Sequence, residues 1–353
     1  MHDPRPRWKK WLLALVKLLV LGLLVWFLRG TLTSAFEKLN EHTWHVQPAW
    51  LVLAGLCYVV GLLPVTIFWN RVLLATDQHV GMFETIRAWW VSQIVKYIPG
   101  KAMVLVVRAG MLRDPKIETT VVAASVFVET LTMMAVGSLL SFFVLLCVNW
   151  HSLLALFSNL TSFADVLKLF ENSAFLTTFA AFGMFVCMGL PTWPPAMKMI
   201  VKVLGVGKLN PTAAKKLGGV PYRVLIFGWI GITIGWFIQG LGLWATLRSL
   251  GIQASLQDLP LITAVVAMST VAGFISLIPG GAGVREFVQT QLMVDDYGAG
   301  NALVASIIWR LVMLVSEVVL SSILYVLGPR RLKHKLGGPN ETADPTPAPA
   351  SKG

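Results

Sequence analysis

The sequence has little charge and very little cysteine. Asp, Glu, Lys and Arg make up 13% of its 353 residues and hydrophobic residues 56%, and the mean hydropathy is +0.71. Such a chain is too apolar for a soluble globular domain and is typical of a protein with several membrane spans. The three cysteines, Cys57, Cys147 and Cys187, all lie in apolar runs. They indicate packing roles and neither a disulfide framework nor a zinc cluster.

The sequence also lacks the common signatures of catalysis and cofactor binding. It contains no Walker loop, no dinucleotide-binding glycine pattern and no Gly-x-Ser-x-Gly nucleophile motif. His42 and His45 have a spacing found in metal sites, but they lie in a predicted outer loop without a nearby cysteine. We therefore expect no cofactor, no metal ion and no enzymatic activity.

Acidic residues are scarce relative to basic ones, which gives a formal net charge of +12. The basic residues gather at both ends and between apolar segments, where the positive-inside rule places them on cytoplasmic loops. Membrane topology explains this charge without a nucleic-acid partner. We expect an integral protein of the bacterial cytoplasmic membrane with both termini in the cytoplasm.

Long apolar runs predict an all-α polytopic membrane protein. A spanning helix needs about 20 mostly apolar residues. Six stretches qualify: residues 11–27, 49–69, 119–148, 174–190, 224–247 and 302–327. They form a single membrane domain over residues 1–337. The segment 338–353 is polar and rich in proline, so we predict a disordered cytoplasmic tail.

Two further apolar stretches, residues 85–111 and 261–293, are interrupted near the middle. Pro-Gly at 99–100 breaks the first, and Pro-Gly-Gly at 279–281 breaks the second. Proline removes a backbone donor and glycine permits a tight reversal, so each stretch should form two half-helices around a break. If both stretches return to their own side, the basic loops all face the cytoplasm. We therefore predict two re-entrant helical hairpins.

The two broken stretches occupy matching places in a predicted internal duplication. The tripeptide Ile-Pro-Gly occurs at 98–100 and again at 278–280. The first repeat covers about residues 49–148 and the second about 224–327. An odd number of crossings separates the two starts, so the copies form an inverted repeat, as in many transporters with a site near the midplane. The alternative is chance recurrence of Pro-Gly in a sequence with 18 prolines and 30 glycines.

The break at 279–281 predicts an anion-binding site. It leaves the following half-helix with unpaired N–H groups and a positive dipole end, and its small residues let a ligand approach the backbone. The candidate substrate-binding residues are Pro279, Gly280, Gly281, Gly283, Arg285 and Glu286. The first break nominates Pro99, Gly100, Lys101 and Arg108, with Lys96 as a further cation. The alternative is a plain chain reversal with Arg285 and Glu286 in the headgroup layer.

Three ionisable residues lie deep inside predicted spans: Glu129, Arg310 and Glu317. Each charged side chain costs roughly 2.5–3.5 kcal/mol to insert, so each requires a partner. Glu129 and Arg310 hold equivalent repeat positions with opposite charge, and we expect them to form a buried pair. Glu317 follows two helical turns after Arg310 on the same face. The three either gate or couple transport, or only fix helix register.

The motifs KYIPGKAMVLVVR (96–108) and IPGGAGVREF (278–287) resemble the N-terminal membrane domain of lysyl-phosphatidylglycerol synthases and related stand-alone, flippase-like membrane proteins. The resemblance covers most of residues 50–327. It implies movement of a lipid between leaflets, with the Pro-Gly segments, Arg285 and Glu286 near the route. No soluble aminoacyl-transferase domain follows Leu327, so we expect lysyl transfer to lie outside this chain. Relatives are associated with glycerophospholipids, polyprenyl-phosphate carriers and hopanoids, which leaves the lipid open.

We therefore expect a lipid flippase or translocase whose partners are anionic or phosphate-bearing membrane lipids. No ATP-binding motif is visible, so transport would be gradient-driven or downhill. One alternative is a membrane-embedded transferase acting on a lipid carrier, with Glu129 or Glu317 as general base. Another is a non-transporting scaffold for a lipid-synthesis enzyme. The oligomeric state does not follow from the sequence.

Overall fold

The computed structural model describes residues 46–97, 102–112, 114, 117–158, 172–193, 195, 216 and 219–327. The predicted span at 11–27, the tail at 338–353 and the candidates Pro99, Gly100 and Lys101 lie outside these residues. Within them every regular element is helical. In chain order they are α2 (Pro48–Ala75), α3 (Met82–Gln93), η1 (Ile94–Tyr97), α4 (Ala102–Met111), α5 (Thr119–Val148), α6 (Trp150–Ser158), α8 (Ser173–Gly189), η2 (Leu190–Thr192), α12 (Tyr222–Ser249), η3 (Leu256–Asp258), α13 (Leu259–Ile275), η4 (Pro279–Gly281), α14 (Val284–Tyr297) and α15 (Ala299–Leu327).

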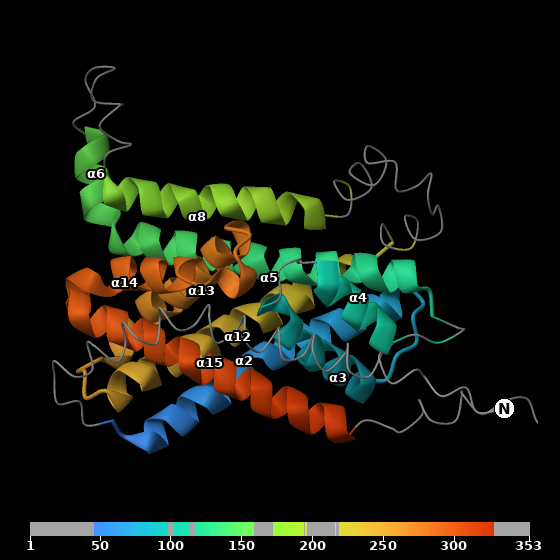
Figure 1. Ribbon diagram of the computed structural model, residues 1–353. Coiled ribbons are helices and arrows are strands. Elements are labelled where there is room, and N and C mark those ends of the chain that lie inside the picture. Colours follow the sequence, from blue (N-terminus) through green and yellow to red (C-terminus); the bar gives the residue numbers. More distant parts are fainter. Residues whose placement is uncertain are drawn as a thin grey trace, which may run out of the picture.

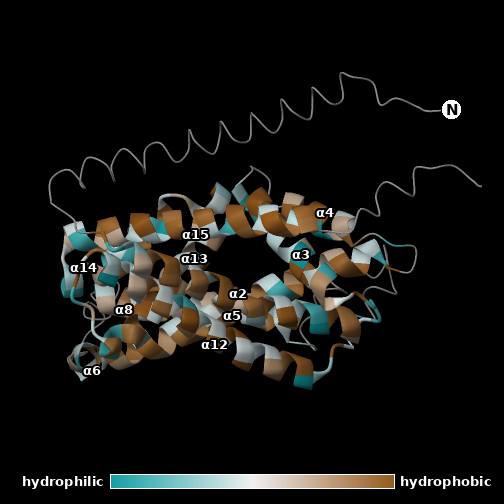
Figure 2. Ribbon diagram, turned by 90° about the horizontal axis from the view of Figure 1, so that it is seen from below, coloured by the Kyte–Doolittle hydropathy of each residue, from teal (hydrophilic) through white to brown (hydrophobic). Residues whose placement is uncertain are grey.

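Among the described residues, six helices are long and apolar enough to cross a membrane. Five of them, α2, α5, α8 with η2, α12 and α15, confirm predicted spans, and the sixth is η3 with α13. Figure 2 shows hydrophobic residues along much of the long helices. Large apolar side chains such as Phe127 and Phe227 are 56% and 72% exposed. Such an apolar outer surface suits contact with lipid, so the all-α membrane class is confirmed.

Helices α2 and α12, which open the two predicted repeats, form the most extensive helix pair. Glycines allow their close approach. A Cβ atom on Gly61 would lie 2.8 Å from the backbone oxygen of Gly235, and one on Gly235 would lie 2.4 Å from the oxygen of Gly61. Small residues commonly bring helices together in a bilayer, where hydrophobic burial supplies little driving force between them. The inverted relation between the repeats stays a prediction.

The second broken stretch folds back on itself as a helical hairpin. Helix α13 ends at Ile275, a short 3₁₀ turn follows, and α14 runs back along α13. The hydroxyl of Tyr297, at the end of α14, donates a 2.9 Å hydrogen bond to Asp258, which directly precedes α13. Burial and this hydrogen bond raise the pKa of Tyr297, so it stays a donor at neutral pH. The two outer ends of this hairpin therefore lie together.

Glycines make the reversal of this hairpin possible. Gly280, Gly281 and Gly283 have φ angles of +60°, +67° and +81°, a region that glycine enters without steric cost. Leu277 shares the turn at φ +60°, where a residue with a Cβ atom is strained. The Pro-Gly-Gly signal therefore predicts both the position and the kind of the break.

The first broken stretch also folds back. Helices α3 and α4 have 12 and 10 residues, or about 18 and 15 Å, which is too short to cross a hydrocarbon core of about 30 Å. The two helices pack together, and Arg108 of α4 donates a 2.9 Å hydrogen bond from Nε to Ser92 of α3. The paired α3 and α4 form the first hairpin, and α13 and α14 the second.

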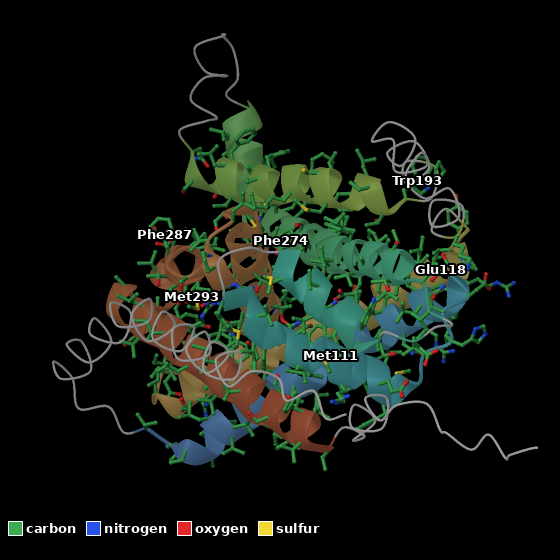
Figure 3. The ribbon with its side chains drawn as sticks, turned by 45° about the vertical axis from the view of Figure 1, so that its right-hand side comes forward. Met111, Glu118, Trp193, Phe274, Phe287 and Met293 are labelled. Atoms are coloured by element: carbon green, nitrogen blue, oxygen red, sulfur yellow. The ribbon has the colours of Figure 1, made fainter. Side chains whose placement is uncertain are left out.

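The two hairpins occupy opposite halves of the bundle. Figure 1 shows α3 and α4 in its right half and α13 and α14 in its left half, among the long helices α2, α5, α12 and α15. Figure 3 places Phe287 of α14 and Glu118, just before α5, on opposite sides of the molecule. The tips of the hairpins, η1 and η4, meet inside the bundle.

Candidate functional site

A cavity of about 270 Å³, lined by charged and polar side chains as well as apolar ones, lies where the two hairpins meet. Both hairpins and the long helices α2, α5 and α12 contribute to its wall. Six residues nominated from the sequence line it: Lys96, Arg108, Glu129, Gly280, Gly281 and Arg285. Five others are not part of the lining: Pro279, Gly283, Glu286, Arg310 and Glu317. The site therefore draws on both broken segments.

Arg108 is completely enclosed by partners. Its Nη1 lies 2.6 Å from Oε2 of Glu129 on α5, and Nε donates to Ser92. Its guanidinium also lies 5.0 Å from the ring centroid of Trp69 and 5.3 Å from that of Trp89, both within cation–π range. The side chains of the ion pair are only 3% and 2% exposed. Arg108 therefore anchors the first hairpin to α5, and its charge is already neutralised.

Glu317 of α15 gathers three donors from two other elements. It forms a buried ion pair with Lys96 of η1 and accepts a hydrogen bond from Tyr58 of α2. The hydroxyl of Tyr97, also in η1, donates to its second oxygen at 3.0 Å. The Glu317 side chain is 1% exposed, whereas that of Lys96 is 23% exposed. This carboxylate ties the tip of the first hairpin to α15.

Arg310 of α15 contacts the tips of both hairpins. Its Nη2 donates a 2.7 Å hydrogen bond to the backbone oxygen of Gly280, and its guanidinium lies 5.5 Å from the ring centroid of Tyr97. Its Nε lies 3.6 Å from Oε1 of Glu286, an ion pair too long for a hydrogen bond. Arg310 and Glu317 thus hold the two tips against the same face of α15.

The expected pair between Glu129 and Arg310 is wrong. Glu129 pairs with Arg108, and Arg310 pairs with Glu286. The reason is that the second arm of each hairpin packs against the long helix that follows it, α4 on α5 and α14 on α15. The nearest opposite charge therefore lies on that arm.

The start of α14 is also less open to an anion than its sequence suggests. Oε2 of Glu286 accepts a 2.7 Å hydrogen bond from the backbone N–H of Gly283. A carboxylate here satisfies one of the donors that the break exposes and neutralises part of the helix dipole. In this structure Glu286 caps α14 and pairs with Arg310, and its role as a ligand contact stays a prediction.

Arg285 is the cation that remains. Within the described ranges, no carboxylate lies within ion-pair distance of its guanidinium, and no hydrogen bond holds it. Its Nε atom is buried without a partner. Its stem packs on α13 at Gly273, where a Cβ atom would lie 2.7 Å from Cγ of Arg285. Arg285 is only partly buried, but a cation that faces a membrane cavity without a counter-charge is costly, so this position favours binding of an anion.

Sequence reasoning missed the neutral polar residues of the cavity. The lining includes Tyr58 of α2, Gln93 of α3, Gln239 of α12 and Thr270 of α13. Gln239 and Thr270 stand inside otherwise apolar spans and are 4% and 7% exposed. A polar residue inside an apolar spanning run is the sequence signal that could have found them.

One side of the cavity is apolar and reaches the outer surface. Val104 and Leu105 of α4, Phe127 and Leu131 of α5, and Phe274 of α13 line it. Phe127 is 56% exposed on the outside of the bundle. Phe274, labelled in Figure 3, lies at the end of α13, which packs against α5. The cavity therefore combines a polar interior with an apolar rim.

A larger groove of about 590 Å³ lies between α8 and α12, away from these charges. Aromatic and aliphatic side chains form most of it, including Phe185, Trp193 and Trp229. No charged side chain lines it. Because it offers no charged partner for an ionised group, the smaller cavity is the better candidate site despite its size.

The chain matches one known family over most of its length. The sequence pattern of the family described as "Lysylphosphatidylglycerol synthase TM region" matches residues 14–321, which include both hairpins and the whole lining of the cavity. No curated protein matches the chain at a significant level. The family match suggests a role related to membrane lipids. On this match, the chain belongs to the family of the lysylphosphatidylglycerol synthase transmembrane region.

Proposed function

We propose that this protein moves a lipid with a phosphate-bearing headgroup between the leaflets of the bacterial cytoplasmic membrane, with both of its own termini in the cytoplasm. The observation that carries the proposal is Arg285, an unpaired cation in a polar cavity among membrane-spanning helices. A phosphate group supplies the missing negative charge and matches the fork of donors on a guanidinium.

The size of the cavity supports a headgroup as the occupant. Its volume of about 270 Å³ lies just below the range of roughly 300–1,000 Å³ found for pockets that bury a drug-sized ligand. A headgroup fits such a space, and two acyl chains do not. The apolar rim with Phe127 and Phe274 would let the chains stay in the hydrocarbon while the headgroup enters.

The hairpins supply the moving parts of this proposal. We take them as re-entrant segments that enter from opposite faces of the membrane and meet at Tyr97 and Gly280. Release of one tip from α15 would open the cavity toward one leaflet, and release of the other tip would open it toward the other. Arg310 and Glu317 hold the two tips, so gating is assigned to them. Glu129 is assigned to anchoring α4.

The proposal assigns no chemical reaction to this chain. A transferase needs a general base, and each buried carboxylate at the cavity or beside it already faces a cation. Among the described residues, Glu129 pairs with Arg108, Glu317 with Lys96 and Glu286 with Arg310. Because a cation already holds each of these carboxylates, none is positioned as a free general base, which favours transport over group transfer.

The test is lipid translocation by the purified protein in liposomes. Phosphatidylglycerol labelled on an acyl chain is followed by quenching of the label in the outer leaflet. We expect transfer by the wild type and a rate at least about tenfold lower for Arg285→Gln, because a lost charge-assisted hydrogen bond weakens binding by about one to two powers of ten. Arg71→Gln, on the exposed side of α2, is the matched control and should keep the wild-type rate.

Two results would overturn the proposal. If the wild type transfers no anionic lipid, translocation is excluded. If Arg285→Gln and the wild type transfer lipid at the same rate, Arg285 has no part in the mechanism.

A further inference from the structure

The carboxylate of Glu317 depends on a single cation. Its side chain is 1% exposed, and among the described residues only Lys96 lies within ion-pair distance of it. Its other two partners, Tyr58 and Tyr97, donate hydrogen bonds from hydroxyl groups. Glu317 belongs to the spanning helix α15. A carboxylate at such a position that loses its cation takes up a proton, because an isolated ionised group is too costly there.

Aromatic side chains pack around Tyr58, one of the partners of Glu317. The rings of Trp90 and Trp309 stand edge-on to the ring of Tyr58, at centroid distances of 6.3 and 5.9 Å. Both indoles are 0% exposed. Rings of this kind solvate an ionised carboxylate poorly, so they offer Glu317 no replacement for the charge of Lys96.

The other ionisable groups near Glu317 come from the elements that pack on α15. These elements are α2, α3, α12, α14 and η1. Toward α15 they present Tyr58 of α2, Arg87 of α3, Lys96 and Tyr97 of η1, and Arg285 and Glu286 of α14, and α15 itself adds Arg310. Helix α12 has ionisable residues only near its ends. Arg87 bonds to the backbone oxygen of Leu324, and Arg310 pairs with Glu286. Among these groups, only Arg285 remains as a second cation for Glu317.

A bound anion removes that second cation. Arg285 and Lys96 both line the cavity, and the charge of Arg285 acts through space on Lys96 and on Glu317. In the empty cavity, the charge of Arg285 is available to Glu317 when Lys96 moves away. A phosphate at Arg285 uses that charge, so Glu317 then has no cation left. The loaded site therefore needs a proton that the empty site does not need.

The cavity gives a proton access to Glu317. Lys96 and Tyr58 both line it, and both contact the same carboxylate oxygen, Oε1. The side chain of Lys96 is 23% exposed. Lysine and tyrosine can each release and regain a proton, whereas arginine keeps its proton in proteins. Water in the cavity is thus separated from Glu317 by one side chain that can pass a proton on.

We propose that Glu317 is a proton-binding site, and that one proton binds there for each anionic headgroup when the first hairpin tip leaves α15. This inference rests on the proposed function and names the ion that drives it. The proton comes from water in the cavity and forms an O–H bond with Glu317, while Lys96 leaves with its own proton. One positive charge thus crosses together with one negative headgroup. Arg310, which holds the second tip at Gly280, retains its proton, so only release of the first tip is linked to protons.

The first test is infrared spectroscopy of the protein in phosphatidylglycerol vesicles at neutral pH. Lys96→Met removes the cation and imitates departure of the tip. We expect this variant to show one protonated carboxyl group more than the wild type, and Lys96→Met, Glu317→Gln to lose it. The matched control is Arg87→Met, which changes a cation that bonds to a backbone oxygen and should add no protonated carboxyl group. The melting temperature of each variant in detergent shows whether it is folded.

The second test applies a pH difference of one unit across liposomes that contain the protein. The membrane is phosphatidylcholine with a trace of labelled phosphatidylglycerol, and potassium with valinomycin holds the membrane potential at zero. The wild type should concentrate the label about tenfold in the leaflet on the alkaline side, because one proton per lipid makes one pH unit worth a factor of ten. Glu317→Gln should leave the label equal in both leaflets, whereas Glu286→Gln should keep the asymmetry. Liposomes without protein measure the redistribution that the protein does not cause.

The outcomes separate this inference from the proposed function. If the wild type distributes the label equally despite the pH difference, no proton is coupled and translocation survives. An asymmetry that persists in Glu317→Gln, or a folded Lys96→Met without the additional protonated carboxyl group, also overturns the proton site. If no lipid moves under any condition, the proposed function fails and the coupling fails with it. The infrared result then decides proton binding at Glu317 by itself.

Discussion

The two hairpins are built alike but carry charge differently. In each one, the second arm is joined to the following long helix by an ion pair, Arg108 with Glu129 in the first and Glu286 with Arg310 in the second. The polarity is reversed between them. The second hairpin also has Arg285, which lies in the cavity without a counter-charge.

The presence or absence of a counter-charge distinguishes an arginine that anchors a hairpin from one that can bind a ligand. Arg108 has a carboxylate, a hydroxyl and two indole rings around it, so it has little to offer a ligand. Arg285 has none of these partners among the described residues. The position of a cation on a hairpin therefore does not decide its role, and the partners around it do.

The largest effect should come from breaking the pair that anchors the first hairpin. Glu129→Gln leaves Arg108 buried without a counter-charge, which costs about 3–5 kcal/mol of unfolding free energy. Glu286→Gln breaks a longer pair and a helix cap, and should cost about 1–2 kcal/mol. Denaturation in detergent, followed by circular dichroism, measures both. Equal losses, or a larger loss for Glu286→Gln, would show that the pair of Arg108 and Glu129 is not the stronger anchor.

The contact between the hairpin tips should give the next effect. An alanine at position 280 places a Cβ atom 2.5 Å from the ring of Tyr97, at a φ angle of +60°. Strain in the left-handed region alone costs about 1–2 kcal/mol. Gly251→Ala, at φ +76° with no atom within 4 Å, measures that strain alone. Gly280→Ala should destabilise the protein more than Gly251→Ala. Tyr97→Ala should remove most of the excess, and the rest comes from Nη2 of Arg310, which lies 2.9 Å from that Cβ atom. Identical losses for the two glycines would argue against a packed tip contact.

A smaller effect is expected at the tip of the first hairpin. Tyr97→Phe removes one of three donors to Glu317 and leaves Lys96 and Tyr58 in place. The loss should be about 1 kcal/mol, the usual net value of one hydrogen bond. The change should also raise the rate of lipid transfer if release of this tip limits opening. The melting temperature and the transfer rate are measured on one preparation, and an unchanged melting temperature would show that the hydrogen bond does not hold the tip.

The sequence contains enough to predict the helices and the break. Apolar runs of spanning length predict α2, α5, α8, α12 and α15, because length and hydropathy are local properties. The Pro-Gly-Gly turn is equally local, since only glycine adopts the backbone angles found at 280 and 281 without strain. The first arm of that hairpin, with η3, is long enough to count as a span itself, which the position of the break alone does not reveal.

The partners of the charged residues could not be predicted, because they depend on how the arms pack. The sequence correctly predicts Glu129 and Arg310 as buried charges. Equivalent positions in the two predicted repeats do not, however, place these two side chains close together. Likewise, Gln239 and Thr270 face the cavity without a hydrogen-bond partner among the described residues. Whether a polar side chain faces the cavity depends on how several helices pack together, and no single stretch of the sequence reveals it.

The central claim is that Arg108 anchors and Arg285 binds. It is tested most directly by Arg108→Gln and Arg285→Gln. For each variant, the melting temperature and the rate of phosphatidylglycerol transfer are measured on the same purified preparation. The account predicts a clear drop in melting temperature for Arg108→Gln, because Glu129 loses its counter-charge. It predicts an unchanged melting temperature and at least about tenfold slower transfer for Arg285→Gln. An Arg285→Gln protein that melts as early as Arg108→Gln, yet transfers lipid at the wild-type rate when folded, would contradict it.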